Sequence, residues 1–559
     1  MDRFLQTPPE LDNAWTSDRI LREALRWHLG DDLLVQAEPE LTRMGQVATA
    51  PGTRALTMQA EHEPPEHIPY STWGERIDEI RVSPAYLALG RIGVEAGITA
   101  LPYEDTPYGA KARLVWAGLH CLWGPSSALY SCPVAMTDAA ARTLLEHGDV
   151  EDVEIVGLLT TRDFEEAWTS GQWMTETAGG SDVGRTATVA TRDANGMWRL
   201  YGTKWFTSAT TADMALTLAR PEGAPAGARG LALFRIHRRL SDGSRNAIVV
   251  RRLKDKLGTR SLPTAELELE GALARPVGDP TEGGGVRRIA TMLNITRIHN
   301  ALGAAGGMGR GLAWARAYAR VREVFGEPLH TRPAHKATLA DLAVDYAAAL
   351  SLTLRSCELT GRMEHGTADD SDVALLRGLT PMTKLATARW AVASAAEVME
   401  AIGGVGYCED SGIPALVRNA HVLPIWEGTT NVLALDLLRA AHKSDSVAAV
   451  INDARATIEG LGDGPTVSTV RSALKELETR ADTTSEASAR SFALGLATTY
   501  ACARLCAQGA WAAAEGDRRT AAIATRLAAR GLLPAGPSED LELAMDDAIV
   551  GEAVVKPQA

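Results

Sequence analysis

The sequence has 559 residues and a formal net charge of −13. This length exceeds what one small core requires and favours several domains. With 45% hydrophobic and 23% charged residues, the composition is that of a globular protein and excludes wholesale disorder. The acidic balance argues against a dedicated nucleic-acid binder, which usually carries a basic excess.

Targeting and metal-binding signals are absent from the sequence. Residues 1–15 contain no apolar stretch typical of a signal peptide, and no uninterrupted apolar run is long enough to span a membrane. Reduced thiols in a cytoplasmic protein are the simplest interpretation of the cysteines, and we expect neither a metal site nor membrane association. The six cysteines lack the spacing of metal ligands: Cys121, Cys132, Cys357, Cys408, Cys502 and Cys506.

Apolar residues at helical spacing dominate the first part of the chain. They predict helices over residues 18–30, 87–96, 111–122 and 138–146. From about residue 158 to 277, short alternating runs replace this period, with turn sequences such as Ala194-Asn195-Gly196 between them. The alternating runs predict strands over 198–201, 214–219, 231–236, 247–252 and 265–270.

The helical period returns after the glycines at 283–285. Helical segments begin near residues 286, 336, 372 and 417, and further helices are predicted over 467–480, 486–514 and 518–532. We therefore predict an N-terminal α-helical domain (1–157), a middle β domain (158–285), a helical bundle (286–443) and a C-terminal helical extension (444–559).

Two motifs near the start of the β region are suited to a planar ligand. In residues 174–183, Gly179 and Gly180 precede Ser181, so that the backbone can approach a ligand closely and offer donors. In residues 202–208, an aromatic pair can form an apolar wall for a ring, and the two hydroxyls that follow can bind its edge. Alone, each motif is equally compatible with an ordinary loop or a buried strand end.

Two later motifs add charged groups. Arg322, in residues 322–328, stands where a helix ends and can bind a pyrophosphate bidentately, although a solvated helix end is the commoner role. Residues 401–407 contain three glycines, and residues 424–431 place Glu427 between Trp426 and Gly428. A carboxylate in such an apolar setting can serve as a general base, although an isolated glutamate is more often a surface residue.

The four motifs in this order resemble the acyl-CoA dehydrogenase family over residues 85–440. The resemblance implies an α+β fold with an N-terminal helical domain, a middle β-barrel or sandwich domain and a C-terminal four-helix bundle, here followed by an extra helical domain. It also implies an FAD cofactor, an acyl thioester substrate, a separate electron acceptor and a homotetramer with cofactor sites shared between subunits.

The family's cofactor contacts carry over to residues of this sequence. The isoalloxazine and its chain would be held by Thr175, Ser181, Trp205, Thr207 and Ser208. The pyrophosphate and adenine side would contact Arg322 and Phe325, the partner's cofactor Gly403 and Gly404, and the near phosphates Thr429 and Asn431. The predicted cofactor site also includes Met174, Gly180, Phe206, Glu400, Trp426 and Gly428.

In the family's reaction, the carboxylate at the position of Glu427 removes the α-proton of the thioester while a hydride leaves the β-carbon for flavin N5. Some members place the base just before an arginine on the helix after the β domain, where this sequence has Thr296 before Arg297, so no second carboxylate competes. Arg260 and Arg297 are the candidate substrate residues.

Several segments resemble the AidB-type adaptive-response branch most closely, namely residues 174–183, 251–258, 407–410 and 425–428. Glu400 stands where ordinary members keep a glutamine, and the extension beyond Lys443 has the length of that branch's C-terminal domain. The branch is associated with DNA binding through this domain, which here is acidic near its end, at Glu539, Asp540, Glu542, Asp546, Asp547 and Glu552. Its arginines at 518, 519, 526 and 530 adjoin Glu515 and Asp517, which disfavours DNA.

Two alternatives to a dehydrogenase remain open: a flavoprotein that protects DNA with vestigial dehydrogenase activity, and a flavin oxidase or monooxygenase on the same fold. Relatives of the second kind often lack the carboxylate that this sequence retains at Glu427.

Overall fold

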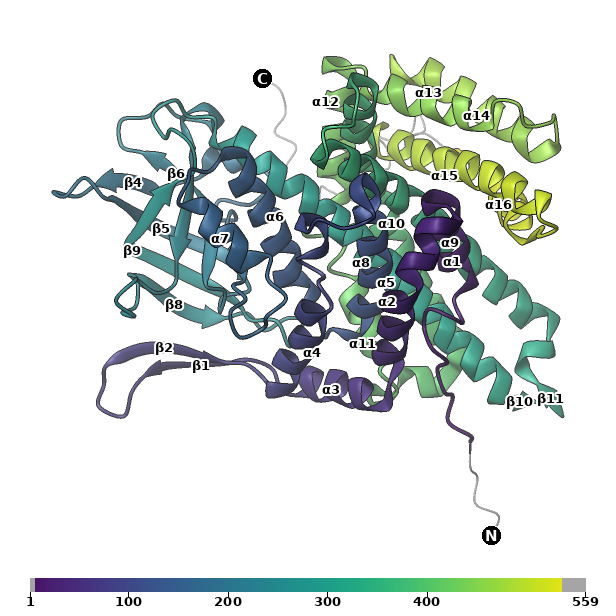
Figure 1. Cartoon of the computed structure of the whole chain (residues 1–559), viewed down its shortest axis with the longest axis horizontal. Helices are drawn as coiled ribbons and strands as arrows, with labels where there is room; N and C mark the ends of the chain where they lie inside the picture. Colours follow the sequence, from purple (N-terminus) through teal and green to yellow (C-terminus); the bar gives the residue numbers. More distant parts are fainter. Residues whose placement is uncertain (1–5, 535–559) are drawn as a thin grey trace, which may run out of the picture. The chain divides into compact units, whose positions relative to one another are not determined.

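The structure, a computed structural model, describes residues 6–534, and the acidic tail noted above lies outside them. The chain forms two compact units (Figure 1). Unit 1 comprises residues 1–373 and 387–428, and unit 2 comprises residues 374–386 and 429–559. Each is described separately below.

The N-terminal part of unit 1 is a layer of helices. Asp18 caps the first of them, since its carboxylate accepts a hydrogen bond from the Leu21 N–H at 3.0 Å. The glycines here permit close packing: a Cβ at Gly90 or Gly93 would lie 2.4 Å from the ring of Tyr130 or Trp123. The helices are α1 (Arg19–Leu29), α2 (Asp31–Thr49), α3 (Pro51–His62), α4 (Pro84–Glu95), α5 (Ala112–Trp123), α6 (Ser131–His147) and α7 (Asp152–Leu159).

A β-hairpin that the sequence patterns did not predict interrupts these helices. Strands β1 (Glu66–Tyr70) and β2 (Arg76–Arg81) pair antiparallel, and Figure 1 shows them running alongside β8 (Ile248–Leu253) of the β domain. Asp78 anchors the hairpin, because its carboxylate contacts His67 at 2.9 Å and Arg245 at 2.7 Å. Four of the six residues of β2 are charged and β1 contains Pro69, which hid the alternation on which a strand prediction depends.

The middle of unit 1 is a β barrel, and all five strands predicted there are confirmed. The sheet has seven strands in the order β3-β6-β4-β5-β9-β7, with β8 paired to β9, and a further β6–β7 pairing closes it. Leu200, Phe234 and Leu267 are completely buried in its core. The strands are β3 (Ser170–Gln172), β4 (Val189–Arg192), β5 (Trp198–Ser208), β6 (Met214–Pro221), β7 (Ala232–His237), β8 (Ile248–Leu253) and β9 (Thr264–Pro276).

A buried ion pair joins the loop after β3 to the middle of β5. The Lys204 ammonium lies 2.8 Å from Glu176 Oε1 and donates a second hydrogen bond to the Leu218 carbonyl oxygen at 3.0 Å. Burial alone would raise the pKa of Glu176, but Lys204 and hydrogen bonds from Thr188 and the Ala187 N–H outweigh it, and the pKa is lowered. The pair therefore keeps this loop against the strand.

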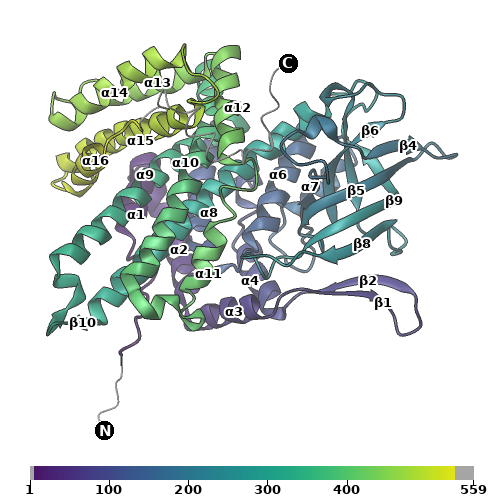
Figure 2. The same cartoon turned by 180° about the vertical axis from the view of Figure 1, so that it is seen from behind.

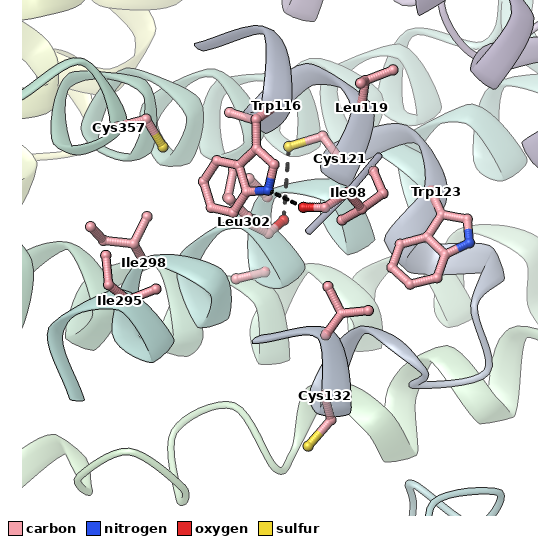
Figure 3. Packing of buried hydrophobic residues seen from close by; sticks show 14 of the residues in the cluster. Ile98, Trp116, Leu119, Cys121, Trp123, Cys132, Ile295, Ile298, Leu302 and Cys357 are labelled. Atoms are coloured by element: carbon pink, nitrogen blue, oxygen red, sulfur yellow. Dashed lines mark hydrogen bonds between the residues drawn. The ribbon is translucent and has the colours of Figure 1, made fainter. Parts of the chain in front are cut away.

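Long helices complete unit 1: α8 (Gly285–Val321), α9 (Pro333–Glu364), the later part of α10 (Asp370–Ile402) and α11 (Ile413–Ala420). Figure 3 shows Trp116 of α5 packed near Leu302 of α8. The Trp116 indole donates to the carbonyl oxygen of Ile98, which follows α4, at 2.7 Å. Helix α9 is the one helix among residues 6–534 that is long and apolar enough to cross a membrane, and 61% of its most apolar window is buried inside the protein.

A second buried charge cluster ties four of these helices together. The carboxylate of Asp138 (α6) accepts hydrogen bonds from Arg113 (α5) at 2.6 Å and from His299 (α8) at 2.7 Å. Arg113 also binds Glu364 (α9) at 2.7 Å. Because both charges of the Arg113–Asp138 pair are paired and hydrogen-bonded, the cluster specifies how the four helices pack.

Unit 2 is helical and begins with the early part of α10. Arg377 of α10 lies 2.7 Å from Asp436, and a Cβ at Gly378 would lie 2.8 Å from the Ser446 carbonyl oxygen, so α10 packs tightly here. The three helices predicted in the extension are confirmed, and α13 was not foreseen. Its helices are α12 (Thr430–Lys443), α13 (Ser446–Ile458), α14 (Pro465–Ala481), α15 (Ala489–Ala514) and α16 (Arg519–Ala529).

We expect Lys204→Met to destabilise the β domain by about 3–5 kcal/mol, because it leaves the Glu176 carboxylate buried without its cation. The double variant Glu176→Gln/Lys204→Met removes both charges and should lose less stability than the single variant. Calorimetric unfolding of each variant measures the difference. Lys336→Met, at an exposed lysine on α9, is the control and should change stability by less than about 0.5 kcal/mol. A double variant no more stable than Lys204→Met would contradict the expectation.

Candidate functional site

The first two sequence motifs lie side by side in unit 1. The Trp205 N–H donates to the Thr175 carbonyl oxygen at 2.9 Å, which joins the loop of residues 174–183 to the end of β5. Met174 is buried beneath the loop, whereas Gly180 and Ser181 are exposed. A Cβ at Gly180 would lie 2.7 Å from Thr175 Oγ1, so this position leaves no room for a side chain on that side.

A bulge at the end of β5 determines which side chains of the second motif are accessible. The register with β9 shifts between Lys204 and Thr207, and Phe206 within this bulge is 52% exposed. Ser208, which follows the bulge, is half-buried. Thr207 is completely buried, and its hydroxyl donates to the Ala265 carbonyl oxygen at 2.8 Å. Ser208 is therefore the hydroxyl of this pair that can reach a ligand, while Thr207 supports the strand.

These residues fit a flavin ring. Half-buried Trp205 and exposed Phe206 offer an apolar surface, and the exposed backbone of Gly179 and Gly180 lies on the neighbouring loop. The Lys254 ammonium lies 3.7 Å from the centroid of the Trp205 ring and forms an ion pair with Glu266 at 2.6 Å, which steadies the indole from one side.

Glu427 lies in the turn that follows α11, and α8 supports it. The Thr296 hydroxyl donates to Glu427 Oε2 at 2.6 Å, and Arg297 Nε donates to the Glu427 carbonyl oxygen at 3.4 Å. The Trp426 indole donates to Asn300, also on α8, at 2.5 Å. Glu427 has a φ of +56°, a left-handed conformation that a glutamate adopts only when its surroundings impose it.

Some members of the family are expected to carry the base at the position of Thr296, where this chain has no carboxylate. In the structure Thr296 supports Glu427 itself, which the sequence order did not reveal. Arg297 contacts the same turn, while Arg260 is exposed on the loop between β8 and β9. That loop packs on α11, since the Thr259 N–H donates to Asn419 Oδ1 at 2.6 Å.

The remaining predicted cofactor residues of unit 1 lie elsewhere. Arg322 follows α8, is half-buried and donates to Gln6 Oε1 at 3.1 Å. Phe325 forms the turn between β10 (Glu323–Val324) and β11 (Glu327–Pro328) and is 97% exposed. Figures 1 and 2 both place β10 and β11 at the end of unit 1 opposite the β barrel, so these two residues are separated from Ser208.

The end of α10 is a further exposed surface. Glu400 is exposed in its last turn, Gly403 ends the helix with a φ of +75°, and Gly404 is exposed. Tyr407 nearby is 80% exposed. Thr429 and Asn431 belong to unit 2, where the Thr429 hydroxyl caps α12 by accepting from the Val432 N–H at 3.5 Å.

Sequence reasoning overlooked the polar residues behind the site. Glu176 and Lys204 lie within the two motifs but were not assigned a role, and Lys256 and Thr264 both lie beyond them in the sequence. The available signal for Lys204 was a lysine just beyond a predicted strand and next to the aromatic pair.

Comparison with known families gives three matches along the chain. The adaptive response protein AidB N-terminal domain matches residues 6–166, the acyl-CoA dehydrogenase middle domain residues 171–272, and the acyl-CoA dehydrogenase C-terminal domain residues 283–442.

Individual relatives extend this similarity. Acyl-CoA dehydrogenase family member 11 of Caenorhabditis elegans is 42% identical over 453 residues, which are 79% of this chain and 73% of the relative. Putative acyl-CoA dehydrogenase AidB of Escherichia coli is 34% identical over 463 residues, 81% of this chain and 82% of the relative. The crystal structure of Caenorhabditis elegans ACDH-11 in complex with C11-CoA has a TM-score of 0.93 and 36% identity, covering 99% of this chain and 98% of that one. The fold class predicted from the motifs is thereby confirmed.

We expect Ser208→Ala and Thr207→Val to separate cofactor binding from stability. Losing one neutral hydrogen bond should lower the FAD affinity of Ser208→Ala two- to tenfold, and loss of the 3.1 Å contact with Thr264 should cost the FAD-free protein about 0.5–1 kcal/mol. Thr207→Val removes the buried hydrogen bond to the Ala265 carbonyl oxygen and should destabilise the FAD-free protein by about 1–2 kcal/mol. Fluorescence titration with FAD and calorimetry measure the two effects. Equal FAD affinity in Ser208→Ala and the wild type would show that this hydroxyl does not face the cofactor.

Proposed function

The chain belongs to the acyl-CoA dehydrogenase family, in the branch that includes AidB, and we propose that it oxidises an acyl-CoA, or an acyl group bound to a carrier protein, between Cα and Cβ. It is an FAD-dependent oxidoreductase. The observation that carries the proposal is the position of Glu427, whose carboxylate is held by Thr296 on a turn supported by α8.

Glu427 has the properties of a general base in this reaction. One of its carboxylate oxygens accepts the Thr296 hydroxyl at 2.6 Å, which leaves the other free to take a proton from the α-carbon of a thioester. The strained turn and the indole of Trp426 limit how far the side chain can move. A base held in this way pays little entropy when the substrate binds.

FAD, when bound, accepts the hydride that leaves the β-carbon. Trp205, Phe206 and Ser208 would hold its ring, with the backbone of Gly180 and Ser181 beside it. Each turnover thus leaves two electrons on the protein, and an electron acceptor outside this chain must remove them.

The substrate class follows from the relatives as well as from the base. The ACDH-11 structure was solved with C11-CoA, which supports a CoA thioester of medium chain length for this chain. Arg297, next to Thr296 on α8, and exposed Arg260 are the proposed substrate residues. A thioester is required because its carbonyl group acidifies the α-proton that Glu427 removes.

We also propose a homotetramer. Phe325 and Tyr407 are large, exposed side chains, and the β10–β11 end of unit 1 lies opposite the barrel that carries Ser208. Arg322 and Phe325 would therefore serve the cofactor of another subunit. A sedimentation profile of a monomer with full FAD occupancy would contradict this assembly. A cytoplasmic location remains a prediction that fits the six free thiols.

The DNA-protecting alternative finds little support in unit 2. Several of its arginines are paired with carboxylates, which would compete with DNA phosphates: Arg455 with Glu478, Arg471 with Asp463, Arg480 with Glu476 and Arg519 with Asp517. The third possibility, an oxidase or monooxygenase, does not require the carboxylate at Glu427.

We expect Glu427→Gln to abolish reduction of the enzyme by its substrate. The amide keeps the size of the side chain but cannot accept the α-proton, so the rate should fall at least about a thousandfold, the scale on which removal of a catalytic group acts. Anaerobic titration of the FAD-loaded protein with acyl-CoAs of increasing chain length, monitored by bleaching of the flavin absorbance, measures this rate and brackets the substrate.

Thr296→Ser and Thr296→Val are the controls. The serine variant keeps the hydroxyl that holds Glu427 and should retain most of the rate, whereas the valine variant should lose about tenfold or more. If no acyl-CoA bleaches the wild-type flavin, the dehydrogenase proposal fails. Titration of DNA at several salt concentrations and measurement of the oxygen reactivity of the reduced flavin would then separate the two alternatives.

A further inference from the structure

A lysine that the proposed mechanism does not use lies behind Ser208. Lys256, on the loop between β8 and β9, donates to the Leu262 carbonyl oxygen at 2.6 Å and to Thr264 Oγ1 at 3.0 Å. Thr264 is the partner of Ser208 in the β5–β9 register, and their hydroxyl oxygens are 3.1 Å apart. A continuous chain of hydrogen bonds therefore joins the Lys256 ammonium to the hydroxyl that faces the cofactor.

The chemistry of the three groups fixes the direction of this chain. An ammonium has donors only, so Lys256 must donate to Thr264. Thr264 is buried, and Ser208 Oγ is the one acceptor within reach of its hydroxyl hydrogen among residues 6–534. Thr264 therefore donates to Ser208, and the hydrogen of Ser208 remains available for a ligand.

Lys256 also lacks a carboxylate partner in direct contact. Among residues 6–534 it has no carboxylate within 4.0 Å, whereas Lys254 on the same loop is paired with Glu266 at 2.6 Å. Glu61, a buried carboxylate near Lys256, already accepts a hydrogen bond from Asn419 and lies 3.9 Å from Arg418. The positive charge of Lys256 can therefore act on the groups around Thr264 and Ser208, at the end of β5.

We propose that Lys256, acting through Thr264, holds the Ser208 hydroxyl as a fixed hydrogen-bond donor to FAD and raises the reduction potential of the bound cofactor. Reduction adds electrons to the isoalloxazine, and a positive charge nearby favours the more electron-rich state. Lys256 is then a positioning residue that makes electron transfer from the substrate easier. The inference rests on the proposed flavin contact of Ser208.

The test is an anaerobic redox titration of the FAD-loaded protein with an indicator dye and without acyl-CoA. We expect Lys256→Met to favour the oxidised cofactor about tenfold over the wild type at a fixed potential, which for a two-electron couple is a potential lower by about 30 mV. Lys256→Arg keeps a cation and should retain the wild-type potential. Thr264→Val keeps the charge of Lys256 but breaks the chain of hydrogen bonds to Ser208. It should shift the ratio of oxidised to reduced cofactor in the same direction as Lys256→Met, but by less.

Lys475→Met, at an exposed lysine on α14 that has no role in the proposed site, is the control for the loss of one lysine charge. Its ratio of oxidised to reduced cofactor should stay within a factor of two of the wild type. Equal potentials in Lys256→Met and the wild type, at full FAD occupancy, would overturn the inference. If Lys256→Met loses FAD, the decision rests on Thr264→Val, and a wild-type potential in Thr264→Val would also reject the relay.

The pH dependence supplies a second readout. Burial lowers the pKa of Lys256 to about 8, because the nearby Cys132 thiol and Glu61 carboxylate offset the burial only in part. Burial raises the pKa of Cys132 to about 12, so it stays a thiol over the same range. As pH rises through 8 the ammonium is lost, and the wild-type potential should fall more steeply with pH than that of Lys256→Met. Parallel pH slopes would contradict the inference. Because the titration uses no thioester, its failure is distinct from failure of the dehydrogenase proposal.

Discussion

The buried ion pair between Glu176 and Lys204 is the interaction on which the cofactor face depends. It connects the loop of residues 174–183 with β5, and its partners Thr188 and Leu218 belong to further segments of the barrel. A charge buried this deeply is costly unless it is fully paired, so the two segments cannot separate without a large penalty. The glycines and the aromatic pair are therefore presented from one rigid surface.

Helix α8 organises the catalytic side in a similar way. Thr296, Arg297 and Asn300 all contact the turn that carries Glu427 and Trp426, and His299 between them joins the Asp138 cluster in the core. The helix thus links the strained turn to the most deeply buried charges of unit 1. A left-handed glutamate persists in such a setting because the surrounding contacts determine its conformation.

The two supports differ in chemistry because they serve different needs. The cofactor face requires a firm backbone and accessible hydroxyl and aromatic groups, which a barrel strand with a bulge provides. The base requires a carboxylate that is held in place but keeps one oxygen free to accept a proton, which a single hydroxyl from α8 allows. Lys256 adds a charge behind the first of these surfaces without occupying it.

The sequence by itself determined the succession of helices, strands and helices, because hydrophobic periodicity is a local property. It also identified the motifs and Glu427, since glycines, aromatic pairs and a carboxylate between apolar residues are visible in order along the chain. The β1–β2 hairpin escaped because its strands are held by ion pairs at Asp78 and not by an apolar face. Only the tertiary structure showed that Thr207 is buried while Ser208 is accessible, that Thr296 supports Glu427, and that Lys256 reaches Ser208. These facts depend on a bulge and on contacts between residues up to 131 positions apart, which no local pattern encodes.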